Sequence, residues 1–294
     1  MKNLLILFLG LSSVLWISSC DKIEGPYIEQ NTLVATCDTP TFTQLTNPIQ
    51  KIFLEEYTGQ TCVNCPQGHK TAATLKTRYE DTMVLMAIHA GIFAEPEAAP
   101  SIFTADYRSE AGNQLNSFFG VQGYPSGIVN RTPFMGMTVL DKSAWSSAIN
   151  ALDRTSPTLA IQLEAVDNSA ENGFCVFVKS TFLQNTLKNY KLTLFLIEDS
   201  IVSPQKNNLA SIGPVPDITD YIHRHMLRTS INSVWGDAIS TITTQSAANS
   251  FVIKGYSFSF SGKPYVKSRC SVIAVVYDSD TKAVVQVEET HLPH

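Results

Sequence analysis

The chain has 294 residues, of which 44% are hydrophobic and 16% charged, and its formal net charge is −5. This balance is typical of a folded protein and argues against a disordered chain. The negative charge gives no reason to expect a nucleic acid or an anionic lipid surface as a partner. The length favours two domains over one.

The first twenty residues are typical of a secretory signal. Lys2 supplies the positive charge, and the apolar run from Leu4 to Ile17 is too short for an ordinary spanning helix. The run ends in Ile17-Ser18-Ser19-Cys20, which resembles the lipobox of bacterial lipoproteins. The resemblance implies that Cys20 is lipidated, and the alternative is an ordinary cleaved signal with an incidental cysteine. We therefore predict a lipoprotein signal peptide over residues 1–20 and a tether over residues 21–48.

The next hundred residues alternate between strand and helix patterns. The expected elements are strands at 51–57 and 82–89, helices at 67–79, 107–119 and 142–152, and short strands after Pro125 and at 137–140. Gly120 is a natural end for the second helix. The glycine, prolines and alanines of 90–106 indicate an insertion or a loop over the sheet. Strand, helix, strand favours a right-handed parallel crossover, so we predict an α/β domain over residues 49–154.

Beyond residue 154 the pattern changes to strands separated by polar turns. Alternating segments occur at 158–166, 174–183, 190–198, 249–261, 266–277 and 283–289. We expect an all-β, immunoglobulin-like sandwich domain over residues 155–294. The less regular stretch 201–248 is expected to form long connections that pack on this sandwich.

A pair of cysteines two residues apart, Cys62-Val63-Asn64-Cys65, lies between the first strand and the first helix. The unpaired N–H groups at a helix N-terminus stabilise a thiolate, so Cys62 is the candidate nucleophile and Cys65 the resolving thiol. A static disulfide is one alternative. Zinc binding is another, although a zinc site usually needs four ligands and no second pair of cysteines is present.

Residues 51 to about 152 resemble the thioredoxin superfamily in the order of their elements around this pair. The resemblance implies that Tyr124–Pro125 is a cis peptide beside the cysteines, and that Glu56 is the buried acid that exchanges a proton with Cys65. The candidate catalytic residues are therefore Cys62, Cys65, Glu56 and Pro125. Tyr124 is a candidate for the substrate groove, with a packing role as the alternative.

The remaining cysteines and histidines carry weaker signals. Cys175 and Cys270 both lie in expected strands and are a possible structural disulfide, with two unbridged core cysteines as the alternative; Cys37 is given no role. His69 is expected to be a solvated helix residue, with tuning of the thiol or a ligand role as the alternative. The pair His223 and His225 is expected to have a polar or packing role in the sandwich, with metal binding as the alternative. No cofactor and no metal site is predicted.

The whole chain also resembles the Bacteroidetes outer-membrane (Omp) lipoproteins that join a thioredoxin-like domain to a C-terminal β-sandwich. The residues that carry this resemblance are Glu55 to Pro66, Gly123-Tyr124-Pro125 and Asp220 to Arg228. It implies a lipid anchor in the outer membrane, with the protein periplasmic or surface-exposed. Two hypotheses stay open: a thiol–disulfide oxidoreductase acting on exported cysteine-containing proteins together with an envelope redox partner, or a non-enzymatic binding or adhesion lipoprotein with a static disulfide.

Overall fold

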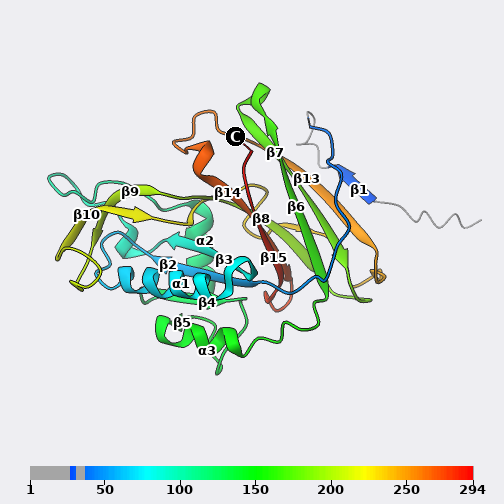
Figure 1. Ribbon diagram of the computed structural model, residues 1–294, viewed down its shortest axis with the longest axis horizontal. Helices are drawn as coiled ribbons and strands as arrows, with labels where there is room; N and C mark the ends of the chain where they lie inside the picture. The colour runs from blue at the N-terminus through cyan, green and yellow to red at the C-terminus, as the bar shows by residue number, and fades with distance from the viewer. Residues whose placement is uncertain (1–26, 31–36, 294) are drawn as a thin grey trace, which may run out of the picture.

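A central nine-stranded sheet joins strands from both halves of the chain (Figure 1). The computed structural model describes residues 27–30 and 37–293. The strand order is β15-β14-β8-β11-β3-β2-β4-β5, and β12 pairs with β8. The N-terminal half contributes β2 (Ile52–Thr58), β3 (Met83–His89), β4 (Ser126–Val129) and β5 (Leu140–Asp141), and the C-terminal half β8 (Tyr190–Glu198), β11 (Met226–Ser230), β12 (Asp237–Ala238), β14 (Cys270–Asp278) and β15 (Val284–His291).

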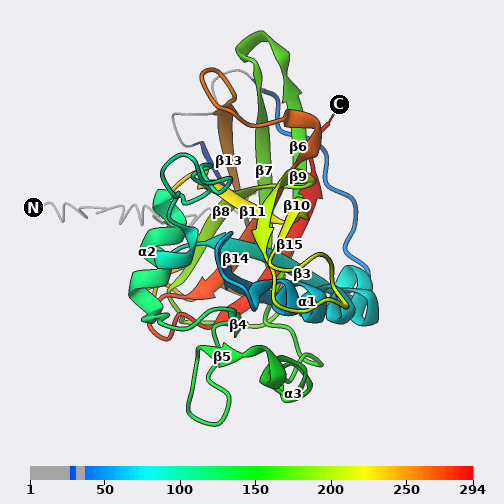
Figure 2. The ribbon, with the colours of Figure 1, turned by 90° about the vertical axis from the view of Figure 1, so that its left-hand side faces the viewer.

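Helices cover both faces of this sheet at β2 and β3, as Figure 2 shows. Leu54 of β2 packs with α1 (Cys65–Tyr79) and α3 (Trp145–Asn150), whereas its neighbour Phe53 packs with α2 (Glu110–Phe119). Successive side chains of a strand point to opposite faces, so an unbroken apolar strand fits between two helical layers. The predicted strand–helix–strand unit is confirmed, and α2 ends at Gly120 in the left-handed conformation, as predicted. Short 3-10 turns lie at Glu80–Thr82, Ile92–Ala94, Lys142–Ala144, Ser169–Glu171 and Lys267–Arg269.

A second sheet packs against the C-terminal strands of the central sheet. It consists of β1 (Tyr27–Gln30), β13 (Phe251–Ser259), β7 (Gly173–Phe182) and β6 (Leu159–Asn168), in that order. Leu194 of β8 faces this sheet and Phe195 faces the α2 side, so both faces of β8 are buried. The second sheet therefore lies on the same face of the central sheet as α1 and α3.

The C-terminal half is β-rich, but an immunoglobulin-like sandwich is not confirmed. Its strand β11 pairs in parallel with β3, with Met226 opposite Ala87, and the Ala87 amide donates to the His225 carbonyl at 2.8 Å. An unpaired edge of β3 would leave backbone groups unsatisfied, and β11 removes that edge. The predicted boundary at residues 154/155 falls between α3 and β6, and strands from both sides of it enter one sheet. The division into two domains stays a prediction.

Residues 201–223 form a two-stranded arm, not connections on the sandwich as the sequence suggested. Strand β9 (Ile201–Lys206) pairs antiparallel with β10 (Asp217–His223), and we call this hairpin the β9–β10 arm. The Lys206 amide donates to the Gln60 carbonyl at 2.8 Å, and the Asn208 amide donates to the Val63 carbonyl at 3.2 Å. The expectation was wrong because the arm finds its partners in the loop that carries the cysteine pair.

Cys175 is bonded to Cys37, so the predicted bridge between Cys175 and Cys270 is wrong. Alternation along β7 gives the reason. Phe174 and Val176 point into the core between the two sheets, which also contains Cys270. Cys175 therefore points to the opposite face of β7, where Cys37 reaches it, and Cys270 stays a buried free thiol whose pKa is raised to about 12 by burial.

Candidate functional site

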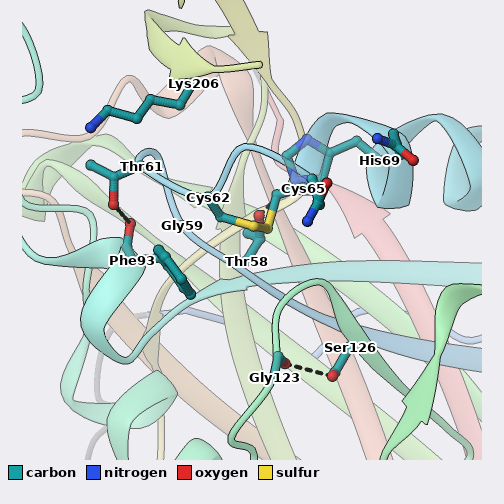
Figure 3. Close-up of a disulfide and its surroundings, with 12 residues drawn as sticks. Thr58, Gly59, Thr61, Cys62, Cys65, His69, Phe93, Gly123, Ser126 and Lys206 are labelled. Carbon is teal, nitrogen blue, oxygen red and sulfur yellow. Dashed lines mark hydrogen bonds between the residues drawn. A yellow bond between two sulfur atoms is a disulfide. The ribbon is translucent and has the colours of Figure 1, made fainter. Parts of the chain in front are cut away.

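Cys62 and Cys65 form a disulfide at the N-terminus of α1 (Figure 3). Two tight turns shape the loop: the Cys62 amide donates to the Gly59 carbonyl at 3.1 Å, and the Cys65 amide to the Cys62 carbonyl at 3.2 Å. The helix starts at Cys65 with Pro66 in its first turn, where a proline costs no hydrogen bond. Its first turn contains no acidic residue, so the positive end of the helix dipole is not neutralised near the sulfur atoms.

Pro125 and Glu56 lie under this first turn of α1. The Tyr124–Pro125 peptide is cis, as predicted. Gly68 makes the close packing possible, because a Cβ atom at this position would lie 2.7 Å from both the Glu56 Oε1 atom and the Pro125 Cβ atom. Strand β4 follows Pro125 directly and pairs with β2, which places Gly127 opposite Glu56. The structure thus places the proline and the acid that the sequence singled out against the helical turn that begins at Cys65.

The two neighbouring glutamates of β2 point to opposite faces and have different partners. Glu55 makes a two-pronged ion pair with Arg131, with nitrogen–oxygen distances of 2.8 and 2.7 Å, and both side chains are fully buried. Glu56 is 5% exposed, and its Oε1 atom has no hydrogen-bond partner among the residues that the structure describes. Burial raises the pKa of Glu56 from 4.5 to about 8, so this carboxyl is mostly protonated at neutral pH.

Two segments that the sequence did not connect with the cysteines cover the disulfide. From the β9–β10 arm, the buried Gln205 amide donates to the Cys62 carbonyl at 3.0 Å and to the Gly59 carbonyl at 3.2 Å. From the other side, the Phe93 carbonyl accepts bonds from the Thr61 amide and hydroxyl (Figure 3). As a result Cys62 is only 2% exposed and Cys65 is fully buried.

Tyr124 packs between α2 and the segment that carries Phe93. Its hydroxyl donates to the Asn116 Oδ1 atom at 2.6 Å, and its ring meets the Phe93 ring edge-on at a centroid distance of 5.9 Å. These contacts hold the chain that enters Pro125. A role of Tyr124 in a substrate groove stays a prediction.

A cavity of about 630 Å³ lies behind the cysteine pair, between α1, the end of β3 and the β9–β10 arm. Its lining includes Glu56, His69, His89, Tyr221 and His223. His69 is not a solvated helix residue, because its Nδ1 atom lies 2.6 Å from the Tyr221 hydroxyl and its Nε2 atom 2.8 Å from Thr58 Oγ1. Burial lowers the pKa of His69 to about 3 and that of His223 to about 4, so both imidazoles are neutral at neutral pH.

The sequence carried a faint signal for these contacts. Tyr221 and His223 are two residues apart, so in a strand they lie on the same face. Nothing in this stretch indicates that this face meets α1. His225 does not continue the strand, because its φ is +53°, and its ring lies on the rim of the same cavity, 3.7 Å from the Asp199 carboxylate.

Two further findings concern metals and membranes. Among residues 27–30 and 37–293, no group of three or more histidine, cysteine or acidic side chains is arranged to hold a metal ion. Within the same residues, no helix has the length and apolar character needed to cross a membrane. The predicted lipidation site, Cys20, lies outside the residues that the structure describes.

The fold and the site define an α/β and β-rich protein that carries a buried Cys-x-x-Cys disulfide at a helix N-terminus and a cis proline against the same helix. The structure of HBP35 of Porphyromonas gingivalis is similar, with a TM-score of 0.61 and 16% identity over 84% of this chain and 76% of that one. A domain of the outer membrane lipoprotein Omp28 from the same organism matches with a TM-score of 0.30 and 21% identity, over 46% of this chain and 88% of that one. Among curated proteins, none matches the sequence.

The family described as outer membrane protein Omp28 matches residues 112–293, more than half of the chain. The chain therefore belongs to the Omp28 family, which confirms the resemblance to the Omp lipoproteins, and the protein is an outer membrane protein. The match begins at α2 and so excludes the cysteine pair. Family membership alone gives no reaction for Cys62 and Cys65.

Proposed function

We propose that this protein is a lipid-anchored thiol–disulfide oxidoreductase of the outer membrane that acts on exported cysteine-containing proteins. The observation that carries the proposal is one arrangement: the Cys62–Cys65 disulfide stands at the start of α1, and cis Pro125 and the buried Glu56 lie against Gly68 in the same first turn. Perturbed acids next to a reactive pair are typical of functional sites, since a purely structural disulfide has no use for a nearby proton donor.

The proposed exchange is balanced in atoms and electrons. A substrate thiolate attacks the Cys62 sulfur, the Cys62–Cys65 bond breaks, and Cys65 leaves as a thiolate that takes the proton of Glu56. A second substrate thiolate then attacks its own partner in the mixed disulfide and releases Cys62. Two electrons pass from the substrate dithiol to the protein, and the reverse sequence reduces a substrate disulfide.

The reduction potential of the pair and a trapping variant test the proposal together. With Cys65→Ala, the mixed disulfide at Cys62 cannot be resolved, so exported proteins should be captured on Cys62 and released by a reductant. The double variant Cys62→Ala, Cys65→Ala is the control and should capture nothing. A catalytic pair should equilibrate with glutathione, whereas a structural disulfide has a potential below about −300 mV.

A second candidate is a binding lipoprotein in which the thioredoxin fold is a scaffold and the disulfide is fixed. The burial of Cys62 and Cys65 under the β9–β10 arm and the Phe93 segment favours it, because no substrate sulfur reaches Cys62 unless one of these segments moves. A potential below about −300 mV together with no captured partner would leave this candidate standing and remove the enzyme.

The anchor is a separate part of the proposal, and it rests on Cys20. Acyl chains contribute about 0.8 kcal/mol per buried CH₂ group, so several chains hold a protein in a membrane stably. The variant Cys20→Ser should move the protein from the membrane fraction to the soluble fraction. Membrane attachment that survives this substitution would show that another element holds the protein.

A further inference from the structure

The Glu56 carboxyl needs a route for its proton. Its Oε1 atom has almost no accessible surface and, within residues 27–30 and 37–293, no hydrogen-bond partner. Each cycle of the proposed thiol–disulfide exchange moves one proton between Glu56 and Cys65. Glu56 must afterwards exchange that proton with solvent. The Nε2 atom of His69 lies 3.8 Å from Oε1.

His69 lies between Glu56 and a second proton-carrying group, and its Nε2 atom must close from 3.8 Å to hydrogen-bond distance for a proton to pass to Glu56. Its Nε2 atom faces Glu56 and hydrogen-bonds to Thr58, whose side chain lies on the same face of β2 as Glu56. Its Nδ1 atom lies on the other side of the ring, 2.6 Å from the hydroxyl of Tyr221, which comes from the β9–β10 arm. A neutral imidazole has one protonated and one free nitrogen, so it can accept a proton at one and release a proton from the other.

We infer that His69, held by Tyr221, relays protons between Glu56 and the cavity behind the cysteine pair, and so sets the rate at which Cys65 reacts. This inference rests on the proposed function. His69 does not touch the reacting sulfur atoms and acts through Glu56, which makes it a positioning residue. Because Tyr221 belongs to the C-terminal half, the thioredoxin-like unit alone does not contain the complete relay.

Protons are conserved both when the Cys62–Cys65 bond opens and when it forms. When Cys65 leaves as a thiolate and takes the Glu56 proton, His69 Nε2–H reprotonates the carboxylate, and Nδ1 takes a proton from the Tyr221 hydroxyl, which is refilled from the cavity. When Cys65 attacks, its proton moves outward along the same atoms. The imidazole never needs to become cationic, in keeping with the low pKa that burial gives it.

Other titratable groups surround the relay. The buried His89 of β3 and His223 of β10 are neutral at neutral pH, because burial lowers the pKa of each. Around the rim of the cavity lie the cationic side chains Lys70, Lys76 and Arg224, together with His225. None of these rim groups is recorded in contact with Glu56, so His69 is the specific candidate.

The attack by Cys62 and the attack by Cys65 can be measured separately, because each releases one coloured thiolate from an aromatic disulfide. We call these two phases of colour release the first and the second burst. The full-length chain with Cys20→Ser and Cys270→Ala has no other free thiol, and mild reduction opens the Cys62–Cys65 bond. Mixing with dithiobis(nitrobenzoate) releases one coloured thiolate when Cys62 attacks and a second when Cys65 resolves the mixed disulfide. The first burst reports the nucleophile and the second the resolving step, in which the Cys65 proton must leave.

In this assay His69→Ala should slow the second burst and spare the first. General acid–base transfer contributes about 10²–10⁴-fold, and water in the cavity replaces part of it, so we expect a loss of about ten-fold. Tyr221→Phe should give a smaller loss, and His225→Gln, on the rim of the same cavity, none. Added imidazole should restore the rate of His69→Ala, and the reduction potential should match that of the parent, because a relay changes rates and not equilibria.

The outcomes separate this inference from the function beneath it. Absence of the first burst in the parent protein removes the proposed oxidoreductase activity, and the relay with it. A normal first burst with a second burst unaffected by His69→Ala overturns the relay alone. So does a slow second burst that imidazole does not restore and that comes with a changed potential, since that pattern describes a structural role.

Discussion

Glu56→Gln should remove a specific pH dependence from the stability of the oxidised protein. Burial raises the pKa of Glu56 from 4.5 to about 8, so the folded state holds a proton that the unfolded state has already lost. The stability from this proton is complete below about pH 4.5 and is lost as the pH rises through 8. A shift of one pKa unit corresponds to 1.36 kcal/mol, which makes the whole effect about 5 kcal/mol.

The window from pH 7 to pH 9 isolates this effect. Over it, a carboxyl with a folded pKa of about 8 goes from mostly protonated to mostly ionised, and the free energy of unfolding falls by about 1.4 kcal/mol. The buried histidines stay neutral in the folded state throughout, because their pKa values are lowered. All other groups titrate equally in the parent and in the variant, so they cancel in the difference.

Urea unfolding at pH 7, 8 and 9, with both disulfides intact, measures the difference. The parent should lose about 1.4 kcal/mol more than Glu56→Gln across the window, with the same dependence on urea. Glu164→Gln, which changes an exposed carboxylate, is the control and should run parallel to the parent. Parallel curves for Glu56→Gln and the parent would refute a buried, protonated Glu56.

Three further changes test the packing around the site. Arg131→Met leaves the buried Glu55 carboxylate without a partner and should cost about 3–5 kcal/mol in unfolding free energy, part of which Glu55→Gln in the same chain should recover. Gly68→Ala puts a methyl group 2.7 Å from the carboxyl oxygen and the proline beneath α1 and should cost about 1–3 kcal/mol by urea unfolding, whereas Gly123→Ala, with no atom nearer than 3.9 Å, should cost less. Cys37→Ser opens a loop with a sequence separation of 138 and should lower the unfolding free energy by up to about 5 kcal/mol; an unchanged midpoint would show that this bridge does not stabilise the fold.

Local patterns were enough to predict the thioredoxin-like part of the site. The cysteine spacing, the acid six residues earlier and the proline before a strand are all set by short stretches of sequence. Glu56 and Pro125 could be placed because the strand and turn that carry them are recognisable without knowing their neighbours. The cis peptide at Pro125 and the burial of Glu56 confirm these two predictions.

What could not be predicted depends on contacts between distant parts of the chain. Tyr221 meets His69 across 152 positions, and Gln205 meets Cys62 across 143. The residues at both ends of such contacts look ordinary in sequence. The sequence therefore does not show which polar residue of a strand will hydrogen-bond to α1 or to the cysteine loop. The cysteine pairing failed for the same reason: spacing gives loop length, whereas the direction of Cys175 depends on which face of β7 the core selects.

The Cys37–Cys175 disulfide also has a mechanical meaning for a protein tethered to a membrane. A force on the chain ahead of residue 27 meets β1 first, which pairs with β13, and then the bridge, which carries it from Cys37 to Cys175 near the start of β7. Both attachments lie in the second sheet, so the force is taken up there and does not have to pass along residues 38–51 to the strand that leads to the cysteine loop.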